Sequence, residues 1–320
     1  MRVLGMGNAL VDIMTRIDKD DFLVKLNLPK GSMQLVDFET ADSVMQASSK
    51  FEKSMASGGS AANTVHGLAK LGVEAAFIGK VGEDEMGEFF KNDLKNSGIS
   101  SKLLSSKTRS GLAVALVSPD AERTFATYLG AAVELSASDL SNEMFIGYDI
   151  FHIEGYLVQN HELIETAIKF AKAAGCKVSI DLASYNVVED NLDFLKKIVE
   201  NVDIVFANEE EAKAFTGMEP TNALHKIADK VHIAVVKIGS KGSMVKTDGK
   251  IYTAGVIKAN SIDTTGAGDL FASGFLYGMS KELPFDKCLE IGSIVAGNVI
   301  EVIGAKMDSQ RWENIYSLVK

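Results

Sequence analysis

Cysteine is scarce in this chain of 320 residues, and hydrophobic runs long enough to span a membrane are missing. The two cysteines, Cys176 and Cys288, lie far apart without paired spacing, which excludes a disulfide framework and a zinc motif. Two small, reduced core cysteines fit a cytoplasmic location, which we expect. No run of about 18 apolar residues occurs, and no basic segment followed by an apolar one resembles a signal peptide, so we expect no membrane partner.

Basic residues are also fewer than acidic ones. The chain has 33 Lys and Arg against 43 Asp and Glu, which gives a formal net charge of −10. An acidic surface disfavours nucleic acid and anionic lipid as partners. It does not disfavour a phosphate ligand, because backbone amides can supply positive potential locally. We therefore expect a small-molecule substrate and no nucleic acid. The histidines show no ligand spacing and receive no role; they are His66, His152, His161, His225 and His232.

Short apolar runs alternate with segments of helical periodicity along most of the chain. This alternation predicts an α/β fold, a doubly wound and mostly parallel sheet with helices on both faces. Gly72 and Gly175 fall where two of the helices should end. The predicted strands cover residues 3–6, 75–78, 150–153, 177–180, 204–206 and 233–238, and the predicted helices include residues 61–71, 163–174 and 192–199.

Two regions, residues 13–38 and 108–128, break this rhythm because strand-like alternation continues without helices between the strands. In the second region, residues 118–122 form a good turn sequence between two predicted strands, 111–117 and 123–128. We predict that the two regions form a small antiparallel β lid, which could pair with a second copy in a homodimer. A longer meander within one sheet is the alternative. The main α/β domain would then comprise residues 1–12, 39–107 and 129–320.

One glycine-rich segment carries the strongest chemical signal. The residues Gly266, Ala267 and Gly268 are small and precede an apolar, helix-like segment, so backbone amides can converge there on an anion. Asp269 follows directly, and the helix dipole should keep its carboxyl ionised and able to accept a proton. Phosphoryl transfer needs both features, donors for the moving charge and a base for the attacking hydroxyl. A helix cap with a first-turn acid is the alternative.

Polar residues also follow the first predicted strand. Asn8 and Asp12 lie at the carboxyl end of that strand, where open α/β sheets bind ligands, and both can bond sugar hydroxyls. Gly58 and Gly59 permit close backbone approach before a helix whose first turn carries Asn63. A turn Asn and a surface Asp are the alternative. An early Gly-x-Gly pair suggests a nicotinamide oxidoreductase, but the third glycine of that fingerprint is missing.

These motifs together resemble the ribokinase-like (PfkB-type) carbohydrate kinases. The run from Asp263 to Asp269 is similar to the family signature, and all the motif groups occur in family order along essentially the whole chain. The resemblance implies that Asp269 is the catalytic base and that the amides of Gly266, Ala267 and Gly268 form the anion hole. It also implies that acceptor hydroxyls contact Asn8, Asp12, Gly58, Gly59 and Asn63.

The resemblance extends to the nucleotide. Residues 208–211 match the family's Asn-x-x-Glu, which implies that Asn208 and Glu211 place magnesium through its waters. A solvated helix start is the alternative. Residues 237–242 are similar to a Lys-x-Gly-x-x-Gly nucleotide loop, for which a hairpin turn is the alternative. The nucleotide-binding positions implied in this way are Asn208, Lys237, Gly239 and Gly242.

The family resemblance implies an ATP-dependent kinase that phosphorylates a primary hydroxymethyl group of a nucleoside or sugar. Asp263 and Thr265 match positions that hold a monovalent cation, K⁺, in many members. The segments 123–125, 128–132 and 152–156 resemble the adenosine-kinase-like branch, which favours adenosine as the acceptor. A fructokinase-like or ribokinase-like sugar kinase is the first alternative, and a catalytically silent nucleoside or sugar binder is the second.

Overall fold

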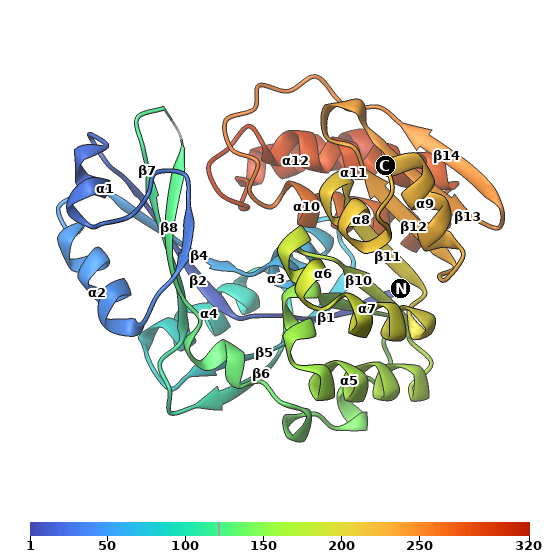
Figure 1. The fold of residues 1–320 in the computed structure, drawn as a ribbon, viewed down its shortest axis with the longest axis horizontal. Helices are drawn as coiled ribbons and strands as arrows, with labels where there is room; N and C mark the ends of the chain where they lie inside the picture. Colours follow the sequence, from blue (N-terminus) through green and yellow to red (C-terminus); the bar gives the residue numbers. More distant parts are fainter. Residues whose placement is uncertain (121) are drawn as a thin grey trace.

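The computed structural model describes residues 1–120 and 122–320 and is built around a nine-stranded sheet (Figure 1). The strand order is β14-β13-β12-β11-β10-β9-β1-β5-β6. Pairing is parallel from β12 to β6, and β13 and β14 extend the sheet as antiparallel strands. The strands are β1 (Arg2–Met6), β5 (Glu74–Gly82), β6 (Ser100–Ser106), β9 (Ile150–Glu154), β10 (Lys177–Asp181), β11 (Ile204–Asn208), β12 (Ile233–Lys237), β13 (Ser243–Thr247) and β14 (Lys250–Ala254).

Helices cover both faces of this sheet, which confirms the predicted doubly wound α/β fold. Alternate residues of β1 point to opposite faces, because Val3 belongs to one apolar core while Leu4 and Met6 belong to another. The first core is closed by α3 (Ser60–Lys70), α10 (Ala267–Ser280), α11 (Phe285–Val299) and α12 (Ser309–Val319). The second is closed by α5 (His161–Ala173), α6 (Tyr185–Asp190), α7 (Leu192–Ile198), α8 (Glu209–Thr216) and α9 (Pro220–Ala228).

The predicted helix ends are present as well. Gly72 and Gly175 each come directly after the C-cap residue of α3 and α5 and have φ values of +83° and +82°. Glycine adopts this left-handed conformation without the cost that a Cβ would impose, which ends each helix before the next strand. Short 3₁₀ turns join other elements; they are η1 (Gly130–Glu134), η2 (Ala137–Asp139), η3 (Asn142–Met144), η4 (Gly155–Gln159), η5 (Val199–Asn201) and η6 (Gly239–Lys241).

A second sheet of five strands stands beside the main domain, with blue and green strands at the left of Figure 1. Its order is β3-β8-β7-β2-β4, so these strands form a separate sheet and not a meander within the main one. Residues 111–117 and 123–128 form the strands predicted there, although Ala121 of the predicted turn lies outside the described residues. The strands are β2 (Leu10–Arg16), β3 (Met33–Leu35), β4 (Lys53–Gly58), β7 (Gly111–Val117) and β8 (Arg123–Tyr128).

The pairing in the smaller sheet corrects one expectation, because the sheet is mixed and not purely antiparallel. The pairs β2–β7 and β3–β8 are parallel, whereas β2–β4 and β7–β8 are antiparallel. The strands β2 and β7 follow β1 and β6, which run parallel in the main sheet, so the chain enters the smaller sheet twice in the same direction. Strand β4 also joins this sheet. The lid boundaries at 13–38 and 108–128 stay a prediction about which residues move together.

One face of the smaller sheet packs against two helices, α1 (Asp21–Lys25) and α2 (Phe38–Ala47). The apolar core there includes Leu23 of α1, Val44 of α2 and the β7 residues Val114 and Leu116. Helix α4 (Glu85–Asn96) adds Phe90 and Leu94 to the same core. The homodimer stays a prediction, with the sheet edges β3 and β4 as its possible contacts. Among the described residues, no helix is both long enough and apolar enough to cross a bilayer.

Candidate active site

A cavity of ≈ 1480 Å³ is lined by residues from both sheets. Apolar side chains of the smaller sheet line one side of it, among them Leu35 of β3 and Phe125 of β8. From the main sheet it receives Asp181, Asn208 and Lys237, each the last residue of its strand. The cavity therefore lies at the carboxyl ends of the parallel strands, the edge where open α/β sheets bind ligands.

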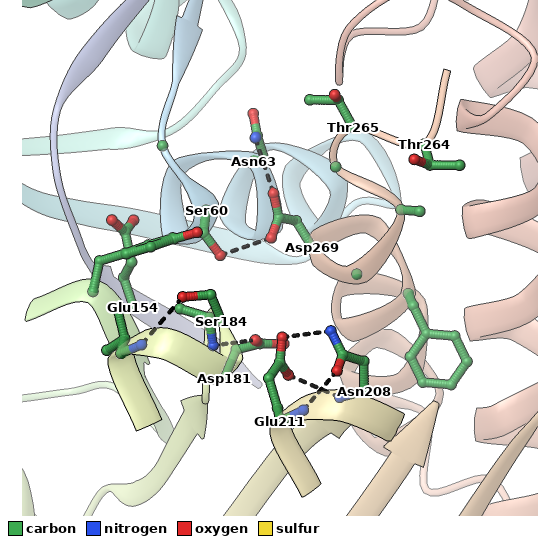
Figure 2. A pocket seen from close by; sticks show the side chains of 18 of the residues that line it. Ser60, Asn63, Glu154, Asp181, Ser184, Asn208, Glu211, Thr264, Thr265 and Asp269 are labelled. Carbon is green, nitrogen blue, oxygen red and sulfur yellow. Dashed lines mark hydrogen bonds between the residues drawn. The ribbon is translucent and has the colours of Figure 1, made fainter. Parts of the chain in front are cut away.

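Asp269 lies in the first turn of α10 and contacts the first turn of α3 in the lining of this cavity (Figure 2). Ser60 Oγ donates a hydrogen bond to Asp269 Oδ1 at 2.7 Å, and Asn63 Nδ2 donates to Oδ2 at 3.0 Å. Thr64 Oγ1 donates to the Asp269 backbone carbonyl at 3.2 Å. These bonds join α3 to α10 and hold the carboxylate in one orientation. Ser60 was missed in the sequence because it looks like an ordinary helix-start serine.

The charge state of Asp269 follows from its burial more than from the helix. We expected the dipole of α10 to keep this carboxyl ionised. Burial instead raises its pKa to about 6, against the opposing hydrogen bonds from Ser60 and Asn63. A carboxyl with that pKa is still mostly ionised at pH 7, and it is a stronger base than an exposed aspartate.

The residues predicted to form an anion hole lie at the start of α10 and line the cavity. Gly266 has φ +72° and caps the helix, and a Cβ at this position would lie 2.6 Å from the Ala305 side chain. The amide of Ala267 donates to the Thr264 carbonyl at 3.2 Å, so it is already engaged. A Cβ at Gly268 would lie 3.0 Å from Lys237 Nζ. The turn thus places a lysine ammonium beside the helix N-terminus.

Lys237 is held by a carboxylate that sequence reasoning missed. Its Nζ donates to Asp181 Oδ2 at 2.8 Å, and the two side chains are 14% and 8% exposed. Burial opposes the lysine charge, but Asp181 and Glu211 raise the pKa of Lys237, so it stays protonated. Asp181 directly follows the predicted strand 177–180 and is the last residue of β10, so the rule that placed Asn8 could have found it.

Asn208 and Glu211 lie together at the start of α8, as predicted, and they bond each other. Asn208 N and Nδ2 donate to the Glu211 carboxylate at 2.8 and 2.6 Å, and Glu211 N donates to Asn208 Oδ1 at 2.9 Å. This capping box uses only part of the oxygens' lone pairs. These remaining lone pairs are free for the waters of a magnesium ion, the role that the family resemblance implies for this pair and that stays a prediction. Among the described residues, no group of three or more His, Cys, Asp or Glu could hold a metal directly.

The predicted acceptor residues converge on the same cavity, except for Gly58. Asn8, Asp12, Gly59 and Asn63 line the cavity, and Asn8 and Asn63 are 7% and 5% exposed. A Cβ at Gly58 would collide with the Asp12 carboxylate, so this glycine makes room for Asp12. A Cβ at Gly59, which has φ +97°, would collide with the Asn8 carbonyl. Both glycines therefore permit close packing around the polar residues.

Asp12 is a buried carboxylate with a buried lysine near it. Burial raises the pKa of Asp12 to about 7, and the charge of Lys306 opposes this shift. Lys306 Nζ is itself buried and has no hydrogen-bond partner within residues 1–120 and 122–320. Burial lowers the pKa of Lys306 to about 8. The sequence offered no motif that would single out Lys306.

Glu154, the last residue of β9, is the second carboxylate that sequence reasoning missed. It is 1% exposed and lines the cavity, and burial raises its pKa to about 7. Its Oε1 accepts from Asn8 Nδ2 at 2.8 Å, and its Oε2 accepts from the Ala61 amide at 3.1 Å. A Cβ at Gly7 would collide with Oε2. In the early Gly-x-Gly pair, Gly7 is therefore explained by the packed carboxylate and Gly5 by the side chain of Val65, so the pair requires no dinucleotide.

Asp263 and Thr265 are placed differently from each other. Thr265 lines the cavity, whereas Asp263 is buried behind it. Asp263 Oδ1 accepts from Thr265 N at 2.7 Å and pairs with Arg123 Nη2 at 2.6 Å, and Oδ2 accepts from Gly304 N at 2.7 Å. Because a guanidinium already neutralises this carboxylate, its contacts do not fit a side-chain ligand for K⁺.

The predicted nucleotide loop lines the far end of the cavity. Gly239 begins η6 and Gly242 follows it, and their φ values of +54° and +102° are conformations that favour residues without a Cβ. Apolar groups complete this end, among them Ile257, which lies against Gly297 of α11. The predicted nucleotide positions and the predicted acceptor positions thus lie in one continuous cavity, with Asp269 in its lining.

Residues 31–311 match the model of the pfkB family of carbohydrate kinases. The chain is 33% identical to a probable sugar kinase from Rhizobium etli CFN 42, over 99% of this chain and 98% of that one, with a TM-score of 0.88. It is also 33% identical to the adenosine kinase from Sinorhizobium meliloti, with the same coverage and a TM-score of 0.87. A sugar kinase from Archaeoglobus fulgidus, itself uncharacterized, is 29% identical over 75% of this chain and 96% of its own length.

Proposed function

The chain belongs to the pfkB family of carbohydrate kinases, and on that premise we propose that it transfers the γ-phosphoryl group of ATP to the primary hydroxymethyl group of a nucleoside, with adenosine favoured. Family membership makes it a kinase that phosphorylates a hydroxyl group of a sugar or nucleoside. The proposal adds the acceptor and the roles of individual residues.

One observation carries the choice of a nucleoside. The acceptor end of the cavity is polar around Asn8 and Asp12, but its lid side is an apolar wall. Met33 and Leu35 are 54% and 64% exposed on this wall, an unusual state for large apolar side chains in a cavity lining. A purine has two flat apolar faces, and covering them together with these side chains is favourable at about 25 cal/mol per Å². A simple sugar would leave the wall in water.

In the proposed reaction, Asp269 accepts the proton of the attacking hydroxyl as its oxygen bonds to the γ-phosphorus and the bond to the β-phosphate oxygen breaks. Ser60 and Asn63 orient the carboxylate so that its remaining lone pairs face the hydroxyl. The free amides of the α10 N-terminus and the Lys237 ammonium stabilise charge on the moving phosphoryl group. Asn208 and Glu211 would hold the waters of magnesium, which neutralises the ATP phosphates.

A sugar acceptor is the second candidate. Two relatives carry the name sugar kinase, and the polar groups near Asp12 would serve a ribose or a hexose equally. The two candidates differ in their contact with the apolar wall, because only the base of a nucleoside would pack against it.

Phosphorylation of adenosine, ribose and fructose by the purified protein tests the proposal. We expect kcat/KM for adenosine to exceed that for either sugar by at least about 100-fold. A sugar lacks the apolar purine face, so it loses both the contact with the wall and the orientation that this contact gives the acceptor. Replacement of Leu35 by Ser should lower kcat/KM for adenosine and leave the sugars nearly unchanged. A sugar that is phosphorylated more efficiently than adenosine would establish the second candidate instead.

A further inference from the structure

Asp263 is a buried carboxylate that holds three segments of the chain together. Its Oδ1 accepts from the amide of Thr265 at 2.7 Å, in the turn that leads into α10, and its Oδ2 accepts from the amide of Gly304 at 2.7 Å, in the loop after α11. The third segment is β8, whose first residue, Arg123, places Nη2 2.6 Å from Oδ1. Asp263 therefore fixes the turn that presents the anion-hole residues 266–268.

A carboxylate in this position needs a positive charge beside it. Asp263 is 1% exposed, and an ionised carboxylate removed from water is costly unless a cation compensates it. The two backbone amides donate to different oxygens of the group, which favours its ionised form. The turn of the anion hole therefore requires a cation at Asp263.

Arg123 supplies that charge from the smaller sheet. Its backbone is held in the β7–β8 ladder opposite Val117, its Cζ lies 5.2 Å from the centre of the Phe125 ring, and its Nη1 is buried without a hydrogen-bond partner within residues 1–120 and 122–320. Burial lowers the pKa of Arg123 and the charges of Asp263 and Asp12 oppose this shift, but a guanidinium in a protein stays protonated. The ladder and the ring together hold a permanent positive charge against Asp263.

The family resemblance implies K⁺ at Asp263 and Thr265, and the contacts of Asp263 disagree with it. K⁺ would bind this carboxylate because of its negative charge, which the guanidinium already cancels from a distance of 2.6 Å. A second monovalent cation at the same carboxylate would also be repelled by the guanidinium, and the buried surroundings would strengthen this repulsion. Thr265 contacts Asp263 through its backbone amide, so it places a donor, and not an oxygen, at the carboxylate.

We propose that Arg123 takes the place of the monovalent cation in this kinase, as a positioning residue that neutralises Asp263 and so holds the anion-hole turn in its working geometry. Phosphoryl transfer then requires no K⁺. Because β8 belongs to the smaller sheet, the charge reaches the anion hole from the part of the molecule predicted to close over the acceptor. This inference rests on the proposed function in assigning the anion hole to residues 266–268, and it applies to any acceptor.

The first test compares salts on the wild-type protein. Its kcat is measured with Mg²⁺ and saturating ATP and acceptor in KCl, NaCl and tetramethylammonium chloride at equal ionic strength, with ATP as its Tris salt so that no alkali ion is carried in. The acceptor is adenosine, or ribose or fructose if the protein uses that sugar instead. We expect kcat to differ by less than about threefold among the salts, because the cation at Asp263 is part of the chain. The melting temperature should also agree within about 1 °C between KCl and tetramethylammonium chloride, since a bound K⁺ would stabilise the folded state.

The second test removes the built-in cation. Arg123→Ala should lower kcat at least about 10-fold in tetramethylammonium chloride, while KM for ATP changes much less, because an anion hole acts on charge that develops in the transition state. Guanidinium ion far below denaturing concentrations, or K⁺, should raise the kcat of this variant at least about fivefold, since a small cation can enter the vacated space and tetramethylammonium is too large to do so. Arg123→Lys loses the planar fork but keeps a positive charge, and it should retain kcat within about fivefold of wild type without an added cation.

Lys80→Ala is the matched control. The Lys80 side chain is 14% exposed, as that of Arg123 is, and it also pairs with a carboxylate, Asp139, at 2.9 Å, but both residues lie outside the lining of the cavity. Its replacement should lower the melting temperature without lowering kcat. Neither guanidinium ion nor K⁺ should change the kcat of this control by more than about twofold.

The proposal is overturned if K⁺ raises the kcat of the wild-type protein by more than about threefold over tetramethylammonium, or if folded Arg123→Ala keeps a wild-type kcat. It is also overturned if the loss in Arg123→Ala is the same in every salt, because Arg123 would then act by its shape and not by its charge. The wild-type comparison stands even where Arg123→Ala does not fold. A wild-type protein that phosphorylates none of the acceptors would instead contradict the proposed function, and a melting temperature raised by K⁺ alone would still overturn this inference, so the two failures are distinguishable.

Discussion

At the scale of single residues, two opposing effects act on the carboxyl of Asp269. Burial favours the neutral acid, whereas the hydrogen bonds from Ser60 and Asn63 favour the carboxylate. The resulting pKa of about 6 lies close to the working pH, where a base combines adequate basicity with a high ionised fraction. The same neighbours that orient the base therefore also set its strength.

Replacement of Asp269 by Asn should leave folding and ATP binding nearly intact, because the amide keeps the size of the side chain. We expect kcat to fall at least about 100-fold, the usual contribution of a general base. Single-turnover kinetics with saturating acceptor measures this step directly. A variant that retains near-normal turnover would remove Asp269 from the role of base.

The pH dependence of kcat tests the same carboxyl without a mutation. Since the folded-state pKa is raised to about 6, the base is ionised above that pH and is lost as pH falls through it. At saturating acceptor we therefore expect kcat to drop about tenfold for each pH unit below 6. A flat profile down to pH 5 would show that another group takes the proton.

At the scale of elements, a buried ion pair joins the smaller sheet to the segment before α10. Arg123 of β8 and Asp263 are 14% and 1% exposed and lie 2.6 Å apart. Removing one partner of a buried pair leaves a charge without compensation. Arg123→Met should therefore lower the free energy of unfolding by about 3–5 kcal/mol, which thermal or urea denaturation would measure.

The exposed pair of Lys197 and Glu165, with side chains 72% and 47% exposed, is the control for that variant. Lys197→Met should change the free energy of unfolding by less than about 1 kcal/mol. Equal, small effects of both substitutions would mean that the Arg123–Asp263 contact does not hold the two parts together.

Whole elements could be predicted from this sequence, but the contacts between them could not. Strands 111–117 and 123–128 were predicted at their observed bounds because alternation is a local signal. The parallel pairing of β2 with β7 depends on partners about 100 residues apart, which no local pattern encodes. Glu154 was missed for the same reason, since it acts on a residue brought near only by the fold. The position of Asp181 at a strand end could have been noticed in the sequence, but its pairing with Lys237 could not.

At the scale of the molecule, the cavity gathers more negative than positive charge. Seven carboxylates line it, and among the described residues that line it Lys237 is the single lysine or arginine. The most buried of these carboxylates are Glu154, Asp181 and Glu211, whereas Asp12 and Asp269 are half-buried. Burial raises the pKa values of Asp12, Glu154 and Asp269, which lowers this charge at neutral pH. ATP is itself an anion, so its binding here depends on magnesium and on the amides at the start of α10.

The smaller sheet faces this cavity with apolar side chains that the main domain does not cover. Met33 and Leu35 are more than half exposed, and β3 is a three-residue edge strand with few hydrogen bonds to protect it. Binding of a nucleoside against this wall would bury both side chains and draw the sheet toward the main domain. Closure would also exclude water, which otherwise competes with the acceptor hydroxyl for the phosphoryl group.

We therefore expect acceptor binding to slow amide hydrogen exchange in residues 13–38 and 108–128 more than in β11 or β12. The core strands are buried on both faces and should exchange slowly with or without ligand, so they serve as the internal reference. Exchange measured by mass spectrometry, with and without adenosine, gives the comparison. Equal protection in both states would argue against a lid that closes on the acceptor. Sedimentation of the free protein would then separate the two remaining causes, because a dimer protects the sheet edges permanently and a monomer does not.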